Sequence, residues 1–259
     1  MVLKKANFLD IELNICTVDE AVEYLLGSKA LQPGYICFPS SDTIAIANKN
    51  SVLKQSFNEA ELTLPDGKVT EWLLKLKGHK SAKAVSSYDI LKELLSTDQC
   101  SHFFYGPHDE TLQNLEMKIT GEFPKAKVLG YLSPPMLHPD KIKEDPQVLK
   151  DVIHINSLKP DFVWIGISSP KQDLLMNCFI QKLDGGRMLG VGAAILYLSG
   201  EIKRSPAWIK KLGLRWLYRM LLEPKRLIPF VVPNLILFLK LIVKDLFGKN
   251  KSAKPESSS

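Results

Sequence analysis

Short β-rich runs alternate with helical runs from residue 8 to residue 192, and this order restricts the fold of the chain more than any other feature. Parallel strands need long crossover connections, which helices supply, so the alternation predicts an α/β fold with a mostly parallel sheet. A helix is expected from Thr17 to Ser28, because Thr17 and Glu20 have the spacing of a capping box. Six runs are expected as strands, at residues 35–38, 61–64, 102–105, 127–132, 161–167 and 187–191.

Almost every expected strand is followed at once by a small, turn-forming segment. The carboxyl ends of parallel strands share one edge of the sheet, so these loops should converge on one crevice that binds a ligand. Glycine and proline also punctuate ordinary turns, which explains any single loop equally well. A site is favoured because polar side chains recur in most of the six loops, at residues 39–42, 65–67, 106–109, 133–135, 168–172 and 192–194.

Asp66 is the first candidate for chemistry, since it follows a strand and precedes a helix. A carboxylate near a helix N-terminus is favoured in its ionised form, which a general base requires. The alternative is a helix cap, a role that Asp often fills. The helix that follows is expected to bury a face made of Val69, Trp72, Leu73 and Leu76.

A second polar cluster follows the apolar run that begins at Asp161. The buried strand leads directly to a helix start that carries Ser168, Ser169, Lys171 and Gln172. Free backbone N–H groups and a cation at a helix start can hold phosphate or sugar hydroxyls. The alternative is a helix initiated by proline, with its polar side chains in solvent.

Composition restricts the class of protein. A chain of 259 residues with 45% apolar and 24% charged residues is neither disordered nor a small disulfide scaffold. The first residues lack the apolar block and cleavage site of a signal peptide, so we expect a cytoplasmic location. Neither the histidines nor the cysteines have the spacing of a metal site, and buried free thiols are expected at Cys16, Cys37, Cys100 and Cys178.

Positive charge is concentrated near the C-terminus. Ten Lys and Arg residues lie between residues 204 and 249 with two acidic residues, although the whole chain carries only +6. This points to a local anionic partner. Because the cations lie beside a stretch rich in Leu, Ile and Phe, nucleic acid is not expected as that partner.

The apolar stretch at residues 228–247 is expected to be broken near Pro229 and Pro233. It looks too short and too charged to cross a bilayer, and it suits a segment that lies in the membrane interface. The alternative is a helix packed on the core or on another subunit.

Several blocks, taken together, resemble the WecG/TagA/CpsF family, which is glycosyltransferase family 26. The likeness runs from about residue 10 to residue 230 and includes LPDG with Asp66, YDILKELL with Asp89, FFYGPHDE with Gly106, and IGISSPKQD with Gln172. It ends with the long stretch from GVGAAILYLSG to EPKRL. The occurrence of PKQ, RSPAW, GLRWLYR and EPKRL in one chain makes the likeness specific.

The resemblance implies a Rossmann-like α/β domain that transfers an N-acetylmannosamine-type sugar, or a related hexose, from a UDP-sugar. The implied acceptor is N-acetylglucosamine on a polyprenyl pyrophosphate, and the transfer inverts the anomeric carbon without a metal or other cofactor. By this likeness Asp66 is the catalytic base. The implied substrate-binding residues are Ser40, Asp89, Gly106, Lys171, Gln172, Gly192, Arg219 and Arg226.

Some positions depart from the family pattern. Phe38, Pro39 and Ser40 stand where Thr-x-Asn is usual, and Ser87 and Tyr88 replace a glycine and a small polar residue. Two further departures are Leu196 in place of Asp and Arg215 in place of the Glu of GLEW. These departures predict either a changed donor sugar, such as glucose, or weakened catalysis.

We therefore expect a catalytic domain at residues 1–200, a basic, aromatic and membrane-associating appendage at 201–248, and a disordered tail at 249–259. The leading hypothesis is a transferase of cell-surface polysaccharide synthesis, attached peripherally to the inner face of the cell membrane. The alternative is a non-catalytic member that binds a sugar nucleotide or lipid in a polysaccharide assembly complex. The retained Asp66 favours the first, and the lost Thr-x-Asn favours the second. A homo-oligomer is compatible with both.

Overall fold

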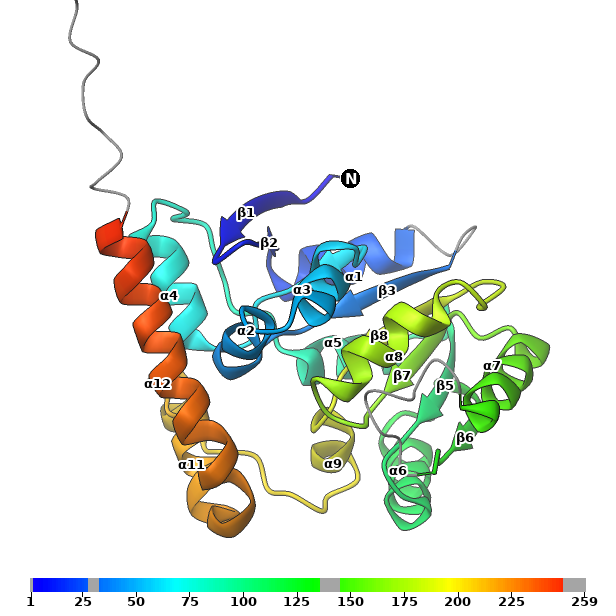
Figure 1. Ribbon diagram of the computed structural model, residues 1–259. Coiled ribbons are helices and arrows are strands. Elements are labelled where there is room, and N and C mark those ends of the chain that lie inside the picture. Colours follow the sequence, from blue (N-terminus) through cyan, green and yellow to red (C-terminus); the bar gives the residue numbers. More distant parts are fainter. Residues whose placement is uncertain (1, 28–32, 136–144, 249–259) are drawn as a thin grey trace, which may run out of the picture.

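A six-stranded parallel sheet forms the centre of the protein (Figure 1). The computed structural model describes residues 2–27, 33–135 and 145–248. The strand order is β4-β3-β8-β7-β5-β6, and every neighbouring pair is parallel. All six strands expected from the sequence are confirmed, as β3 (Gly34–Cys37), β4 (Leu62–Thr63), β5 (Ser101–Tyr105), β6 (Lys127–Leu132), β7 (Phe162–Ile165) and β8 (Arg187–Gly190).

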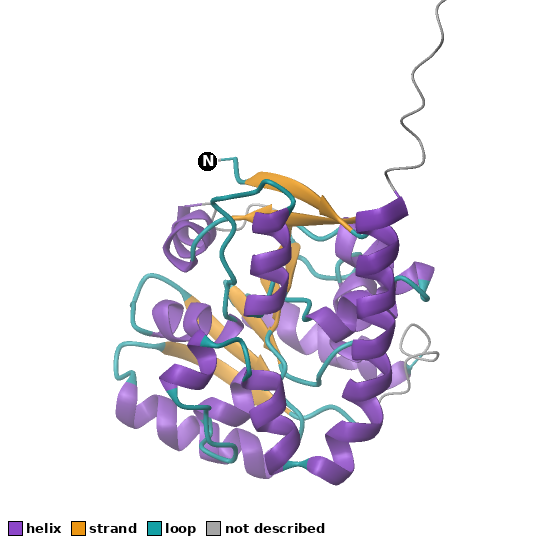
Figure 2. Cartoon of the chain, turned by 90° about the vertical axis from the view of Figure 1, so that its left-hand side faces the viewer, coloured by secondary structure: helices purple, strands orange, loops and turns teal. Residues whose placement is uncertain are grey.

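Helices cover both faces of this sheet and make it a three-layer fold (Figure 2). One face packs on α2 (Ser41–Ala47), α3 (Ser51–Asn58), α7 (Pro146–Leu158) and α8 (Lys171–Phe179). The other face packs on α1 (Val18–Gly27), α5 (Ser87–Leu95), α6 (Asp109–Glu122) and α9 (Ala194–Leu198). The Rossmann-like α/β architecture is thereby confirmed.

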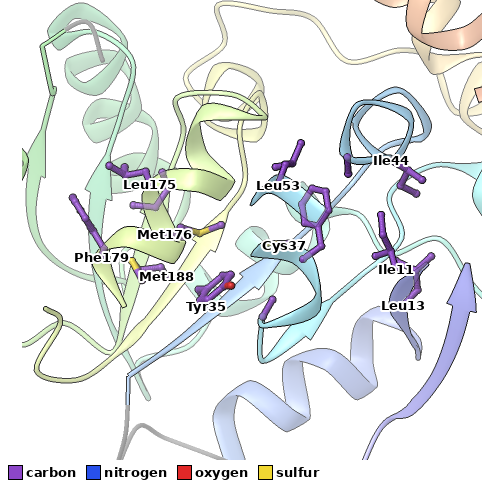
Figure 3. Close-up of a cluster of buried hydrophobic side chains, with 14 of the residues drawn as sticks. Ile11, Leu13, Tyr35, Cys37, Ile44, Leu53, Leu175, Met176, Phe179 and Met188 are labelled. Carbon is purple, nitrogen blue, oxygen red and sulfur yellow. The ribbon is translucent and has the colours of Figure 1, made fainter. Parts of the chain in front are cut away.

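The apolar runs of the central strands follow from burial on both faces. In β7, Val163 and Ile165 point into one core, whereas Phe162 and Trp164 point into the other. Such a strand has no solvent side and therefore reads as a continuous apolar run. We call the core that contains Val163 and Ile165 the first core and the other the second core. Figure 3 shows part of the first core, where side chains of β3 and α8 meet. The four cysteines are free and buried, as expected.

Local signals set the first helix. The Thr17 N–H donates to Glu20 Oε2 at 2.7 Å, and the Glu20 N–H donates to Thr17 Oγ1 at 3.2 Å. This reciprocal pair is the capping box that the sequence predicts, and it satisfies two donors that the first turn would otherwise leave open.

An N-terminal hairpin was absent from the sequence-based expectation. β1 (Lys4–Phe8) and β2 (Ile11–Ile15) pair antiparallel through a turn at Leu9 and Asp10, both with positive φ. Two-residue turns of this kind usually carry Asn or Gly, so Leu-Asp gives no turn signal. Ile11 and Leu13 are fully buried against the first core, which compensates for the strained turn.

The prediction of which residues are buried in the helix after Asp66 was wrong in part. In α4 (Lys68–Leu76), Leu74 and the polar Glu71 are buried, whereas Trp72 and Leu76 are exposed. Burial disfavours ionisation of Glu71, yet hydrogen bonds from Lys68, Lys75 and the Ala84 N–H hold its pKa at about 2. These partners allow the Glu71 carboxylate to be buried, although the predicted face of this helix did not include it.

The C-terminal region forms α10 (Ala207–Lys211), α11 (Arg215–Leu222) and α12 (Pro224–Gly248). The expected break at Pro229 and Pro233 was wrong, because α12 runs through both prolines. Proline has a φ that a helix accepts, although each one here removes a backbone donor and crowds the carbonyl four residues before it. The argument that this stretch is too short and too charged was also wrong, since Pro224–Leu246 is long and apolar enough to cross a membrane by length and composition.

α12 packs on the rest of the fold along one side only. Phe238 and Ile242 are buried against the first core, and α12 contacts α2. Phe238 lies 6.3 Å from the Phe8 ring, and Asp245 pairs with Lys77 at the end of α4. Figure 1 shows α12 beside α4 at the edge of the molecule. The expected disordered tail lies outside the described residues.

Candidate active site

The loops after β3 and β4 meet at the carboxyl edge of the sheet. The Asp66 N–H donates to the Pro39 carbonyl at 3.2 Å and ties the two loops together. Gly67, with φ of 110°, then turns the chain into α4. Asp66 is half-buried and its side chain remains 23% exposed, so the carboxylate is accessible from solvent.

The C-terminal region reaches this carboxylate. Arg215, the first residue of α11, donates from Nη2 to Asp66 Oδ1 at 2.5 Å. The two residues are 149 positions apart in the sequence. The charge of Asp66 raises the pKa of Arg215, against the opposing effect of burial, and keeps the guanidinium cationic.

Charged side chains act on Tyr197 of α9. Burial raises the pKa of the Tyr197 hydroxyl, whereas the charges of Arg219 and Arg215 lower it. The Arg219 guanidinium lies 5.6 Å from the Tyr197 ring centre. Arg219 and Arg226 both pair with Glu223, at 3.0 and 2.6 Å. The two arginines expected to bind substrate are therefore joined by one acidic residue.

Asp89 of α5 binds two cations of the C-terminal region. Arg204 donates to Asp89 Oδ1 at 3.2 Å, and Lys210 donates to Asp89 Oδ2 at 2.8 Å. Burial opposes ionisation of Asp89, but these two cations lower its pKa below the ordinary value. Arg204 also stacks on Tyr88, 3.8 Å from the ring centre. Asp89 thus anchors the segment that leads to α11, and its contact with substrate stays a prediction.

Gln172 is buried in the first turn of α8. Its Nε2 donates to the Gly190 carbonyl at 2.7 Å and to Ser169 Oγ at 3.3 Å. Its Oε1 is buried without a hydrogen-bond partner, and a Cβ at Gly192 would lie 3.3 Å from it. Gly192 has φ of 49°, so this position favours glycine for both backbone and space. Gln172 braces the loop after β8 and presents one unpaired acceptor there.

The remaining expected site residues lie around this centre. Ser40 precedes α2 without a capping hydrogen bond from its side chain, and its Oγ donates to Asp42 Oδ1 at 2.5 Å. Lys171 begins α8 and is half-buried. Gly106 is buried where a Cβ would lie 2.3 Å from Leu112, so it permits close packing of α6. Within the described residues, no hydrogen bond or ion pair links Gly106 or Arg226 to Asp66.

Three of the departures from the family pattern have clear structural places. Phe38 is buried in the second core, below the loop that leads to Ser40. Ser87 is buried, and its hydroxyl donates to the Val191 carbonyl at 3.5 Å. Leu196 is half-buried in α9, next to Tyr197.

The sequence did not predict the residues that contact Asp89 and Arg219, which are Arg204, Lys210, Tyr197 and Glu223. Only Glu223 has a local signal, because it lies four residues after Arg219 and three before Arg226 on helical segments. Among the described residues, no group of three or more His, Cys, Asp or Glu side chains is arranged to hold a metal ion. Metal independence stays a prediction.

Asp173 is a buried carboxyl that sequence reasoning did not single out. It lies in the first turn of α8 and is 1% exposed. Burial raises its pKa to about 6, although nearby Ser169 and Cys37 favour the ionised form. Ionised Asp173 is thus destabilising near neutral pH.

Asp173→Asn is expected to gain stability over the wild type as the pH rises. The folded-state pKa exceeds the ordinary value of 3.8, so between these values the folded protein holds a proton that the unfolded chain has lost. The wild type therefore loses stability from about pH 4 to pH 6, and the difference should shift by about 3 kcal/mol. Urea denaturation at pH 4 and pH 7 measures it, with exposed Asp109→Asn as control. An equal difference at both pH values would contradict the prediction.

Comparison with known proteins identifies the family of the chain. The model of the glycosyl transferase WecG/TagA/CpsF family matches residues 6–252. Two similar proteins are both named N-acetylglucosaminyldiphosphoundecaprenol N-acetyl-beta-D-mannosaminyltransferase. The one from Bacillus subtilis strain 168 is 26% identical over 172 residues, covering 65% of this chain and 64% of that protein, slightly under two thirds. The one from Bacillus spizizenii strain W23 is 24% identical over 227 residues, covering 86% of this chain and 84% of that protein. Since the family match extends over nearly the whole sequence, from the hairpin through α12, the chain belongs to the WecG/TagA/CpsF family of glycosyltransferases.

Proposed function

We propose that the protein is an inverting glycosyltransferase that moves an N-acetylmannosamine-type sugar, or a related hexose, from a UDP-sugar. The proposed acceptor is N-acetylglucosamine carried on a polyprenyl pyrophosphate. The observation that supports this most is the partly exposed Asp66 carboxylate at the carboxyl end of β4, placed against an arginine-bearing helix. The names of both relatives support the acceptor and the sugar class.

In this proposal Asp66 is the general base. It takes the proton of the acceptor hydroxyl while that oxygen forms a bond to the anomeric carbon of the donor. The bond between this carbon and the β-phosphate oxygen breaks on the opposite side, so the configuration inverts and UDP leaves. The proton ends on Asp66, and the electron pair of the broken bond ends on the diphosphate.

The departing diphosphate needs cations or N–H donors, and arginine gives it bidentate contacts. Arg219 and Arg226 are proposed for this role, with Glu223 holding both until the donor binds. Lys171 and the backbone N–H groups at the start of α8 are a second group of donors on the same edge of the sheet. No metal or other cofactor has a step in this scheme.

The lipid acceptor explains why the exposed side of α12 is apolar. Ile236, Leu239 and Val243 are each at least half exposed, and they line a shallow groove with Lys240 and Lys244. A polyprenyl chain stays in the bilayer, so the enzyme must reach it there. We propose that α12 lies along the inner face of the cell membrane, because its opposite side is fixed to the protein by Phe238 and Ile242.

The proposed reaction is tested with a panel of UDP-sugars and a short-chain pyrophosphate-linked N-acetylglucosamine acceptor, with products read by mass spectrometry. Transfer from one UDP-sugar, with the anomeric centre inverted, is the expected result. Binding of UDP without any transfer would favour the non-catalytic alternative. Neither binding nor transfer would overturn the proposal.

Membrane attachment is expected to need the exposed side of α12. The full-length protein should sediment with anionic vesicles at low salt and less at high salt, because screening removes the contribution of Lys240 and Lys244 but not the apolar one. The combined variant Ile236→Ser, Leu239→Ser and Val243→Ser should stay in the supernatant. Ile153→Ser on α7, which is 69% exposed, is the matched control and should bind like the wild type. If the wild type stays in the supernatant, the groove is a contact between subunits.

A further inference from the structure

The ion pair between Asp66 and Arg215 occupies the proposed base in the ligand-free chain. Arg215 Nη2 lies 2.5 Å from Asp66 Oδ1, and their side chains are 27% and 23% exposed. While Oδ1 accepts from the guanidinium, that oxygen is not free to accept the proton of an acceptor hydroxyl. The free protein therefore holds Asp66 in a resting state.

The backbone holds Arg215 in this place. Gly213, with φ of 69°, turns the chain between α10 and α11. A Cβ at Gly213 would lie 3.0 Å from the Trp72 ring and 3.1 Å from Lys68 Cβ, so the turn packs directly on the start of α4. Asp66 lies two residues before α4. The contact between Arg215 and Asp66 is therefore supported by the packing of this turn on α4.

Every arginine near Tyr197 already binds a carboxylate of this chain. Arg204 pairs with Asp89, Arg219 with Glu223, and Arg215 with Asp66. An anion that binds here competes with these carboxylates for the guanidinium groups. A diphosphate has more charge and more acceptor oxygens than one carboxylate, so it competes well for a planar guanidinium.

We propose that Arg215 is a positioning residue that binds Asp66 in the free protein and passes to the donor diphosphate, so that donor binding releases the base. This inference rests on the proposed function. The exchange breaks the Nη2–H···Oδ1 hydrogen bond and forms guanidinium–phosphate hydrogen bonds, without any covalent step. It orders the reaction, because Asp66 becomes available to the acceptor only after the donor is bound.

The test is a double-mutant cycle on UDP binding by calorimetry with the full-length protein. Asp66→Asn replaces the charged partner of Arg215 with a neutral amide, which holds the guanidinium less strongly, so UDP no longer competes with a carboxylate. It also removes repulsion between Asp66 and the diphosphate. Arg215→Met leaves only the second effect. We expect Asp66→Asn to tighten UDP binding about threefold to fivefold when Arg215 is present, the factor for one partly exposed ion pair. In the Arg215→Met background the change should stay below about 1.5-fold.

Two controls make the cycle specific. In an Arg204→Met background, which disturbs the pair with Asp89 instead, Asp66→Asn should still tighten UDP binding about threefold to fivefold. Arg215→Lys keeps the positive charge but lacks the planar guanidinium, and it replaces Arg215→Met if that variant does not fold. In the Arg215→Lys background, the effect of Asp66→Asn on UDP binding should lie between those in the other two backgrounds. The same Asp66→Asn effect with and without Arg215 would overturn the inference alone. If the wild type does not bind UDP, both the inference and the proposed function fail.

Discussion

Asp66→Asn is expected to slow sugar transfer by about 100-fold to 10,000-fold, the usual contribution of a general base. Asparagine keeps the shape of the side chain and still accepts a hydrogen bond from Arg215, but it cannot take a proton. The fold should therefore persist, and UDP should still bind. Initial rates with saturating donor and acceptor, together with circular dichroism and calorimetry, measure these three properties.

Asp19→Asn is the control for this experiment. Asp19 is also a carboxylate at the start of a helix, but it is exposed on α1. Among the described residues it forms no ion pair with Arg204, Arg215 or Arg219. Its variant should keep the wild-type rate. If Asp66→Asn keeps more than about a third of the wild-type turnover, Asp66 is only a helix-start carboxylate and another group removes the proton.

Phe238→Ala is expected to lower the free energy of unfolding by about 4 kcal/mol, as for other fully buried phenylalanines. Phe238 is 0% exposed and packs with Phe8 of the hairpin and with the first core. Its loss leaves a cavity between α12 and the rest of the fold. Urea denaturation followed by circular dichroism gives the change.

The neighbouring residue is a matched control, because Leu239 is 54% exposed. Leu239→Ala should change the free energy of unfolding by no more than about 0.5 kcal/mol. The two substitutions therefore separate the docked side of α12 from the side proposed to face the membrane. If Phe238→Ala costs less than about 1 kcal/mol, α12 is not packed on the core in solution.

The parts of the fold that could be predicted are those whose signals are short in sequence. The six strands of the sheet were recognisable because burial on both faces makes each one a short apolar run. The helix after Thr17 was recognisable because its capping partners are three residues apart. The alternation of these elements also placed the loops at one edge of the sheet, and with them Asp66 and Gln172.

The missed features depend on partners from elsewhere in the chain. The hairpin has a turn without Asn or Gly, and burial of Ile11 and Leu13 against the core compensates for it. Glu71 is buried because Lys68, Lys75 and Ala84 satisfy its carboxylate. The continuation of α12 through two prolines is accompanied by packing of its later turns on α2.

By itself, the sequence determined the α/β class, the order of the strands along the chain, the motif positions that indicate the family, and the apolar, basic character of the C-terminal region. Tertiary structure decided which charges meet. Arg215 departs from the family pattern and has no local feature that points to Asp66, yet the packing of the turn at Gly213 against α4 brings the two into contact across 149 residues. The physical reason is that the periodicity of a helix or strand can be recognised from a few neighbouring residues. An ion pair between distant residues depends instead on how separate elements pack together.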